Sequence, residues 1–278
     1  MKPKRILTIA GSDSGGGAGI QADLKTITVL GGFGMSVITA LTAQNTLGIK
    51  AIHKVPPAFV AKQFDAVAED IGANAAKTGM LVSAEIIQVV AEKIRQYGIE
   101  ELVVDPVMVA KGGAQLIRQG AIETLKKALI PLARVVTPNI PEAEVLSGLV
   151  IASREDMKRA AHMIHGLGAR NVVIKGGHLP GLAIDLLYNG KDFLEFSTER
   201  INTEHTHGTG CTYSATIATM LAFRKSLPEA VREAKAYITL AIQHSLHIGS
   251  GQGPIDHFAA IREEVKRLRN LVKCDVCK

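Results

Sequence analysis

The sequence predicts a three-layer α/β/α protein, in which helices cover both faces of a doubly wound, mainly parallel sheet. Short aliphatic and β-branched runs alternate with amphipathic stretches along the chain, which is the pattern of repeated β-α units. Several strand-like runs are apolar on both faces, as buried parallel strands are. Polar and glycine-rich segments follow directly after these runs, at the edge where such sheets bind ligands.

The expected elements alternate in order. The strands are expected at 6–10, 36–42, 75–78, 102–104, 135–137, 172–174 and 184–188. The helices are expected at 20–30, 58–71, 84–97, 122–129, 154–167, 212–224 and 228–248. A further strand at 193–198 is joined to its predecessor by a segment containing Asn189-Gly190, which predicts a small hairpin. We place this hairpin at the edge of the sheet.

Length and composition indicate a single domain spanning residues 1–278. The chain is large enough to bury a sizeable core, and its 47% hydrophobic content includes no Trp. No apolar run approaches the roughly 20 residues needed to cross a bilayer. The first apolar run is too short for a signal peptide, so we expect a cytoplasmic protein with no membrane contact.

Charge and cysteine content argue against several other classes. The net charge is +6, and the stretch 262–278, expected to form a basic C-terminal helix or tail, holds six Lys or Arg against three Asp or Glu. The remaining excess suits an anionic small substrate and is too weak to predict nucleic-acid binding. Three cysteines make no disulfide framework in a chain of this size. The lone pair Cys274 and Cys277 supplies at most two metal ligands and is interpreted as incidental.

A glycine-rich turn before the helix expected at 212–224 is the clearest candidate site. It contains Gly208, Gly210 and Cys211 and leads directly into the helix-forming run. The start of a helix presents unpaired N–H groups and the positive end of the helix dipole, which suit a phosphate or a developing negative charge. At this position the thiol pKa of Cys211 is expected to be lowered. A plain glycine-rich cap with a buried Cys explains the segment equally well.

A second glycine-rich stretch, from Gly11 to Asp23, follows the first expected strand. The spacing of Gly15, Gly17 and Gly19 is too compact for a dinucleotide fingerprint, and no Gly-Lys-Ser/Thr follows to make a P-loop. Asp23 lies one turn into the next helix. It either accepts hydrogen bonds from a substrate hydroxyl or amino group, or decorates the helix start, where the dipole favours a carboxylate.

Polar residues at other strand ends extend the candidate site. Gln44 and Asn45 follow the second strand, and a side-chain amide suits the edge of a heteroaromatic ring. Asp105 ends a buried strand before a proline. Lys175 ends another strand before two glycines, where it could reach a nucleotide phosphate or simply begin a turn.

Three oxygen-bearing side chains predict a magnesium site. Asn139 and Glu142 lie three residues apart at an expected helix start, where they share a face. With Asp105 they form an oxygen-rich group suited to Mg²⁺ held partly through water. Taken without Asp105, Asn139 and Glu142 are better explained as a helix start with an acid near its N-terminus.

The order of these motifs resembles the ribokinase-like family of small-molecule kinases. A glycine-rich turn is followed by a strand-end Asp-Pro, by Thr-Pro-Asn-x-x-Glu, by Lys-Gly-Gly-His, and by Gly-Thr-Gly-Cys opening a helix. Within that family, the opening Gly-Ser-Asp-Ser-Gly-Gly-Gly-Ala-Gly-Ile-Gln-Ala-Asp and the closing His-Gly-Thr-Gly-Cys-Thr are similar to those of the hydroxymethylpyrimidine/phosphomethylpyrimidine kinases. The resemblance covers residues 11–254.

The resemblance implies an activity, its cofactors and its site residues. It implies a homodimeric kinase of thiamine biosynthesis that uses ATP and Mg²⁺ to phosphorylate 4-amino-5-hydroxymethyl-2-methylpyrimidine and then its monophosphate. The positions that match the pyrimidine pocket are Gly11, Asp23, Gln44, Met80, Val107 and Cys211. The positions that match the nucleotide and metal side are Thr137, Asn139 and Lys175, with Asp105 and Glu142 at the metal. The positions expected to act at the transferred phosphoryl group are Gly208, Gly210 and Cys211.

Departures from the family pattern bear on the substrate. Cys211 stands where many sugar-kinase relatives carry an Asp that serves as base. The loop at 111–114 reads Lys-Gly-Gly-Ala rather than Lys-Ser-Gly-Asp, and it lacks the second Cys of some pyridoxal-phosphorylating relatives. This absence favours the pyrimidine and leaves pyridoxal or pyridoxine as the alternative acceptor. Two other classes stay open: a thiol enzyme with Cys211 as nucleophile and His205 or His207 as base, and a nucleotide-binding protein without catalysis.

Overall fold

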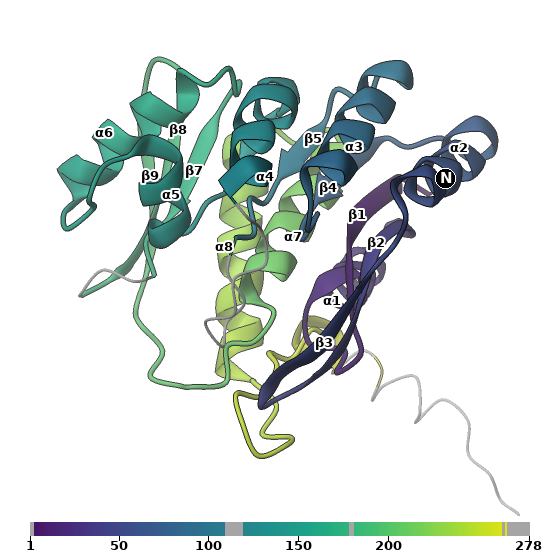
Figure 1. Cartoon of the computed structure of the whole chain (residues 1–278). Helices are drawn as coiled ribbons and strands as arrows, with labels where there is room; N and C mark the ends of the chain where they lie inside the picture. Colours follow the sequence, from purple (N-terminus) through teal and green to yellow (C-terminus); the bar gives the residue numbers. More distant parts are fainter. Residues whose placement is uncertain (1–2, 109–118, 178–180, 263–264, 266–278) are drawn as a thin grey trace, which may run out of the picture.

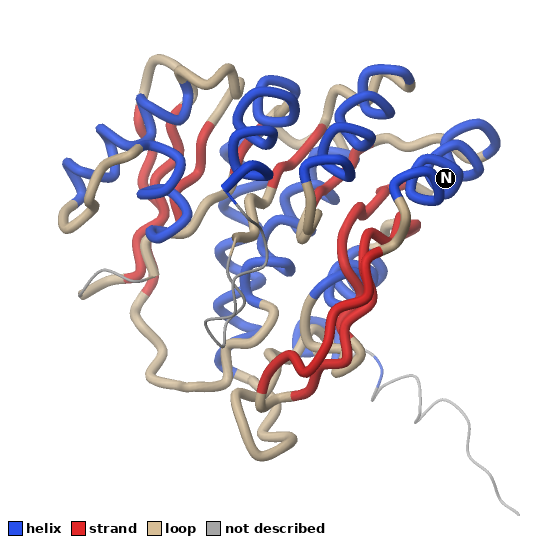
Figure 2. Tube along the Cα trace, viewed as in Figure 1, coloured by secondary structure: helices blue, strands red, loops and turns tan. Residues whose placement is uncertain are grey.

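The structure, a computed structural model, describes residues 3–108, 119–177, 181–262 and 265. These residues form a nine-stranded sheet with helices on both faces, which confirms the predicted α/β class (Figures 1 and 2). The strands are β1 (Arg5–Asp13), β2 (Phe33–Asn45), β3 (Gly48–Lys54), β4 (Ala75–Thr78), β5 (Leu102–Val104), β6 (Val135–Val136), β7 (Val172–Lys175), β8 (Ala183–Tyr188) and β9 (Phe193–Thr198). The helices are α1 (Gly19–Val29), α2 (Pro57–Asp70), α3 (Ala84–Gln96), α4 (Gln119–Thr124), α5 (Ile140–Ser147), α6 (Arg154–His165), α7 (Thr209–Ala222) and α8 (Leu227–Gln243).

The sheet is parallel in its centre and antiparallel at its edges. Its strand order is β3-β2-β1-β4-β5-β6-β7-β8-β9. All pairs from β2 to β7 are parallel, whereas β3 pairs antiparallel with β2, and β8 and β9 continue antiparallel beyond β7. The predicted hairpin is therefore confirmed at the sheet edge, and β3 is an edge strand that the sequence analysis did not predict.

Two cores lie on opposite faces of this sheet. Residues of α2 to α6 pack on one face, and residues of α1, α7 and α8 pack on the other (Figure 1). Along β5, Leu102 and Val104 belong to the first core and Val103 to the second, which is the alternation of a strand buried on both sides. Both helical layers are thus held by aliphatic burial.

Helix boundaries follow local capping and chain reversal. Ser83 and Ser153 cap α3 and α6 by accepting hydrogen bonds from the backbone N–H groups three residues beyond each cap. The helix expected at 122–129 divides into α4 and a π-helical turn, Leu125–Leu129. The helix expected to reach residue 248 ends at Gln243, because the N–H of Leu246 bonds to the carbonyl of Pro254 in a returning loop.

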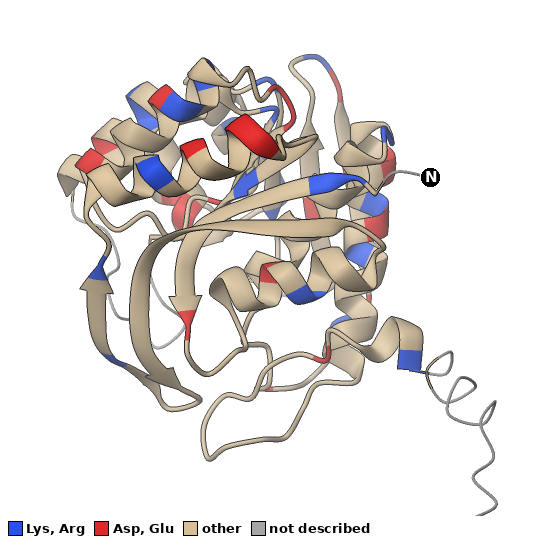
Figure 3. Ribbon diagram, turned by 90° about the vertical axis from the view of Figure 1, so that its right-hand side faces the viewer, with Lys and Arg blue, Asp and Glu red and all other residues tan. Residues whose placement is uncertain are grey.

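The charged residues do not gather by sign on the side of the molecule seen in Figure 3, where Lys and Arg are interspersed with Asp and Glu along the helices. Within the described ranges, no helix combines the length and the apolar character needed to cross a membrane. The basic tail predicted at 262–278 lies outside the described residues, except for positions 262 and 265.

Candidate functional site

The parallel strands bring the predicted site residues to one edge of the sheet. Asp105 directly follows β5, Thr137 follows β6, and Lys175 is the last residue of β7. The N-terminus of α7 lies at the same edge, since Ser214 in its second turn bonds to Asp105. These groups are far apart in the sequence, and they meet because parallel strands end on the same side.

Lys175 and Asp105 form the charged centre of this site. Lys175 Nζ lies 2.9 Å from Asp105 Oδ1, and Asp105 is 3% exposed. The same carboxylate accepts hydrogen bonds from the hydroxyls of Thr137 at 3.4 Å and Ser214 at 3.3 Å. Burial alone would lower the pKa of Lys175, but the carboxylates of Asp105 and Glu142 raise it overall. Lys175 therefore stays a cation at the end of β7.

Asn139 and Glu142 form a capping box at the start of α5. Asn139 Oδ1 accepts a hydrogen bond from the N–H of Glu142, and Glu142 Oε2 accepts one from the N–H of Asn139, both at 2.9 Å. The helix-start interpretation of these two residues is thus confirmed. Burial raises the pKa of Glu142 to about 7, Lys175 opposes this shift and Asp105 adds to it.

The balance of charged side chains at this site indicates whether a metal ion fits. Asp105 and Glu142 are both buried and share Lys175 as their nearest cation partner. A divalent cation with oxygen ligands would neutralise this surplus, so the donor set fits Mg²⁺. Among the residues that the structure describes, no cluster of three or more His, Cys, Asp or Glu is arranged to hold a metal. The fit is therefore to an ion held by one or two carboxylates together with water and phosphate oxygens.

The glycines of the α7 turn are required by close backbone contacts. Gly208 has φ +88°, and a Cβ on it would lie 1.8 Å from the carbonyl oxygen of Gly17. A Cβ on Gly210 would instead point at Lys175 Nζ, 3.5 Å away, and at Asp105 Oδ2, 3.7 Å away. No side chain caps this helix start. The open first turn of α7 therefore faces the lysine–aspartate pair directly.

The predicted lowering of the Cys211 pKa is wrong. Burial raises the pKa of this thiol to about 11; nearby Lys77 lowers it, while Asp23 and Asp105 raise it. The helix N-terminus does not compensate for the loss of solvent around the sulfur. At neutral pH Cys211 is a thiol, which also removes the main support for a thiol nucleophile in the free enzyme.

Asp23 lies beneath the site as half of a buried ion pair. It is fully buried, and both of its oxygens lie 2.9 Å from Lys77 Nζ, with the Thr8 hydroxyl donating to Oδ2 at 2.6 Å. Because it faces the sheet, its interpretation as a decoration of the helix start is wrong. Lys77 was not identified from the sequence, although a lone lysine in the apolar strand 75–78 was the available signal.

The remaining predicted pocket residues lie around the strand ends. Gly11 and Met80 are in contact, since any side chain on Gly11 would overlap the Met80 side chain. Val107 donates its N–H to the carbonyl of Asp105 at 2.9 Å. Gln44 lies near the end of β2, where its amide accepts from the hydroxyl of Thr42 at 3.2 Å. The loop at 111–114, His178 and the two C-terminal cysteines lie outside the described residues.

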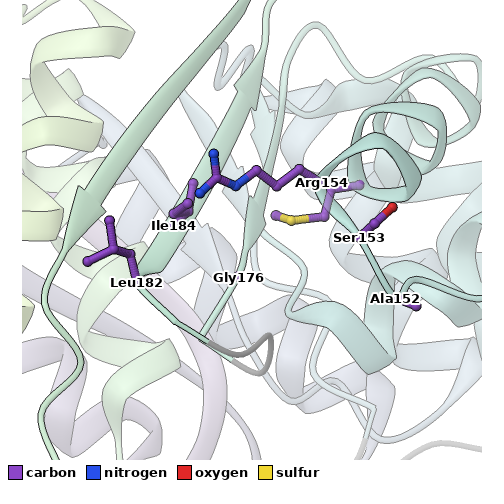
Figure 4. Close-up of a pocket in the computed structure, with 7 residues that line it drawn as sticks. Ala152, Ser153, Arg154, Gly176, Leu182 and Ile184 are labelled. Carbon is purple, nitrogen blue, oxygen red and sulfur yellow. The ribbon is translucent and has the colours of Figure 1, made fainter.

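A small cavity of about 140 Å³ lies beside this region, on the α6 face (Figure 4). Its lining residues are Ala152, Ser153, Arg154, Met157, Gly176, Leu182 and Ile184. None of them is a predicted site residue, and Arg154 is paired with Glu195. The cavity adjoins the cluster around Lys175 through Gly176, the next residue in the chain.

Comparison with known proteins places this arrangement in a family. The family model for phosphomethylpyrimidine kinase matches residues 13–256. The hydroxymethylpyrimidine/phosphomethylpyrimidine kinase of Bacillus subtilis is 49% identical over 271 residues, covering 97% of this chain and all of that protein. The thiamine biosynthesis bifunctional protein ThiED of Geobacter sulfurreducens is 57% identical over 259 residues, which are 93% of this chain. The chain spans about half of ThiED, since the match covers 53% of that protein.

Solved structures extend the likeness to the whole fold. The Bacillus subtilis pyridoxal kinase, solved as an ADP complex, superposes with a TM-score of 0.89 at 39% identity, covering 94% of this chain and all of that one. The ribokinase-like fold predicted from the motifs is thereby confirmed. The chain belongs to the phosphomethylpyrimidine kinase family.

Proposed function

We propose that this protein transfers the γ-phosphoryl group of ATP to the hydroxymethyl group of 4-amino-5-hydroxymethyl-2-methylpyrimidine, and then to the resulting monophosphate. The observation that supports this most directly is the position of Gly210, whose missing side chain leaves space facing Lys175 and Asp105 at 3.5 and 3.7 Å. Helix N–H groups, a lysine and a carboxylate therefore converge on one point. Phosphoryl transfer depends mainly on such positioning and charge neutralisation.

The donor side of the site is assigned to the strand ends of β5, β6 and β7. Lys175 neutralises charge on the nucleotide phosphates, and Thr137 and Asn139 contact the nucleotide. Asp105 and Glu142 would hold Mg²⁺, which supplies charge neutralisation to the phosphates when bound. The first N–H groups of α7, from Gly208 to Cys211, stabilise the charge on the transferred group.

The acceptor side is assigned to Gly11, Gln44, Met80 and Val107, with Asp23 below them. Gln44 presents an amide that suits the edge of an aminopyrimidine. Cys211 acts by shape rather than as a base, because its thiol keeps its proton at neutral pH. This role is sufficient, since an alcohol needs little deprotonation before a loose transition state and a phosphate acceptor needs none.

Pyridoxal phosphorylation is a second candidate activity, favoured by the structural likeness to a pyridoxal kinase. The homodimer and the cytoplasmic location predicted from the sequence complete the proposal. Sedimentation of the intact chain tests the first of these, and fractionation of the source cells tests the second.

Product analysis with three acceptors tests the proposed reaction. The purified chain is incubated with ATP and either hydroxymethylpyrimidine, its monophosphate or pyridoxal, with and without Mg²⁺. We expect Mg²⁺-dependent conversion of both pyrimidines to phosphorylated products. ATP consumption without a pyrimidine product, or exclusive conversion of pyridoxal, would contradict the proposal.

Two lysine variants sharpen this test. Lys175→Met is expected to lower kcat about a hundredfold or more, because it removes a preorganised charge facing the transferred group. Lys225→Met removes a lysine from a surface pair with Glu233 whose two side chains are 47% and 45% exposed, and it should leave kcat unchanged. Equal activity of the two variants would refute the assignment of Lys175.

A further inference from the structure

Asp13 organises the glycine-rich loop that follows β1. Its Oδ1 accepts a hydrogen bond from the N–H of Gly15 at 2.8 Å, and its Oδ2 accepts from Gly17 at 3.1 Å and from Ala18 at 2.8 Å. The residue is 3% exposed. Burial opposes ionisation, but the hydrogen bond from His207 and those from the loop lower the pKa of Asp13 overall. Asp13 is therefore a carboxylate around which the loop is wrapped.

His207 connects this carboxylate to the turn before α7. Its Nε2 lies 2.9 Å from Asp13 Oδ2, across 194 residues of sequence. Its backbone is fixed on both sides, because its N–H bonds to the carbonyl of Gly253 and its carbonyl accepts from Ile255. The imidazole also packs against Gly17, where a Cβ would lie 2.5 Å from His207 Cδ2. One side chain thus spans from the turn to the loop.

The two glycine segments touch directly at this point. A Cβ on Gly208 would lie 1.8 Å from the carbonyl oxygen of Gly17. Gly208 is the N-cap of α7, directly before its first residue, and Gly210 faces Lys175 two residues later. Any change in the spacing between loop and turn therefore moves the N–H groups of α7 relative to Lys175.

The proton on His207 is directed to Asp13 and not to Gln44. His207 Nε2 is also 3.4 Å from Gln44 Nε2. A ring nitrogen that donates to a carboxylate cannot accept from an amide N–H, so this second contact is not a hydrogen bond. The role of His207 is consequently to hold the loop rather than to orient the Gln44 amide.

We propose that Asp13 and His207 are positioning residues, which hold the loop at 14–18 against the turn at 207–210 so that the start of α7 faces Lys175 at a fixed spacing. The inference rests on the proposed kinase function for its kinetic consequence. Its structural consequence, a shared ordering of the loop and the turn, is independent of the substrate.

The kinetic test compares His207→Ala with His207→Gln. His207→Ala should lower kcat about ten- to a hundredfold, because small misplacements of reacting groups have effects of this size. The KM for the pyrimidine should rise as well, because Ser14 in the same loop donates to the carbonyl of Gln44 and accepts from its N–H, both at 2.8 Å. His207→Gln keeps an N–H donor and should recover part of the loss. An unchanged kcat in His207→Ala, or a defect confined to KM for the pyrimidine, would overturn the proposal.

Amide hydrogen exchange of the intact chain without ligands supplies a readout besides activity. His207→Ala should accelerate exchange at the N–H groups of Gly15, Gly17 and Ala18, although their acceptor Asp13 is still present. Asp13→Asn should in turn accelerate exchange at 207–210. Unchanged exchange at 14–18 in His207→Ala would overturn the proposal even where kcat falls.

Lys25→Gln is the matched control. Lys25 Nζ donates to the carbonyl of Gly16 at 2.7 Å, so it contacts the same loop from α1 without reaching the turn. We expect kcat within about twofold of the wild type and unchanged exchange at 207–210. Absence of activity in the wild-type chain would refute the proposed function alone, because the exchange experiment still decides whether the two residues order both segments.

Discussion

Replacing Lys77 with Met should strongly destabilise the fold, because the buried carboxylate of Asp23 loses the cation that neutralises it. Lys77 and Asp23 are both 0% exposed, and Lys77 Nζ lies 2.9 Å from each oxygen of Asp23. Burial alone would lower the pKa of Lys77, but Asp23 and its neighbours raise it overall, so the lysine stays charged. Burial raises the pKa of Asp23, and Lys77 and the Thr8 hydroxyl oppose that shift. Met has a similar length and no charge, so the variant leaves the Asp23 carboxylate buried without a cation beside it, with the Thr8 hydroxyl as its remaining partner.

The expected loss is about 3–5 kcal/mol in the free energy of unfolding, the usual result of removing one partner of a buried pair. With about 2–4 °C per kcal/mol for larger domains, Tm should fall by roughly 10 °C. The deficit depends on pH in a defined direction. Burial already raises the folded-state pKa of Asp23 in the wild type, and loss of Lys77, which lowers it, raises it further. The folded variant therefore binds more protons than the unfolded chain, and its stability falls as pH rises through that folded pKa.

Urea unfolding at pH 5 and pH 8 measures both effects. The Lys77→Met deficit should be smaller at pH 5, and the double variant Lys77→Met with Asp23→Asn should recover part of the loss, because no charge remains. Lys93→Met is the control: it breaks a pair with Asp65 in which the two side chains are 17% and 31% exposed, and it should cost less than about 1 kcal/mol. A Lys77→Met deficit below about 1 kcal/mol at pH 8 would refute the reasoning.

Three further predictions follow from burial and glycine geometry. Burial lowers the pKa of His257 to about 4, below its ordinary 6.5, so the unfolded chain binds the proton first as pH falls. The free energy of unfolding should fall by about 2 kcal/mol between pH 7 and pH 5 in the wild type, and by less in His257→Gln. Urea unfolding that gives the same fall for both proteins would contradict this. With the other two cysteines replaced by Ser, alkylation of Cys211 should be slow at pH 8 and accelerate only above about pH 10. A fast reaction at pH 7 would mean an exposed thiolate. Gly208→Ala should lower Tm, because the added Cβ would lie 1.8 Å from the backbone oxygen of Gly17. Gly210→Ala should keep Tm but bind the nucleotide more weakly in calorimetry, because its methyl group enters the space in front of Lys175. The reverse pattern would exclude this geometry.

The fold could be predicted wherever burial of an element produces a regular pattern of apolar residues in its sequence. The central strands β5 and β6 are buried on both faces and are continuous apolar runs. β3 was missed because it is an edge strand: most of its residues, Gly48–Lys54, are exposed, so its apolar residues follow no alternation. The end of α8 was placed too late because the chain there turns back through tertiary contacts, including that of Gly251 with the backbone of Thr46.

The site was predictable to the extent that strand ends predict it. Asp105 and Lys175 each end an apolar strand, which is why their position at one edge of the sheet could be predicted. The contacts of Lys77 and His207 are with residues 54 and 194 positions away in the sequence, and no local sequence pattern predicts such contacts. The Cys211 pKa was predicted in the wrong direction, because the helix start is visible in the sequence while the desolvation of the sulfur depends on the packed fold.

Two lysine–aspartate pairs with the same nitrogen–oxygen distance differ in exposure, and this difference supports the role proposed for Lys175. The nitrogen–oxygen distance is 2.9 Å in both, but Lys77 and Asp23 are completely buried, whereas the side chain of Lys175 is 15% exposed beside Asp105. In the proposed reaction, Lys175 would therefore be accessible to a nucleotide phosphate, whereas Lys77 is not. Asp105 would be one of the residues that hold Mg²⁺, which would supply charge neutralisation to the phosphates when bound.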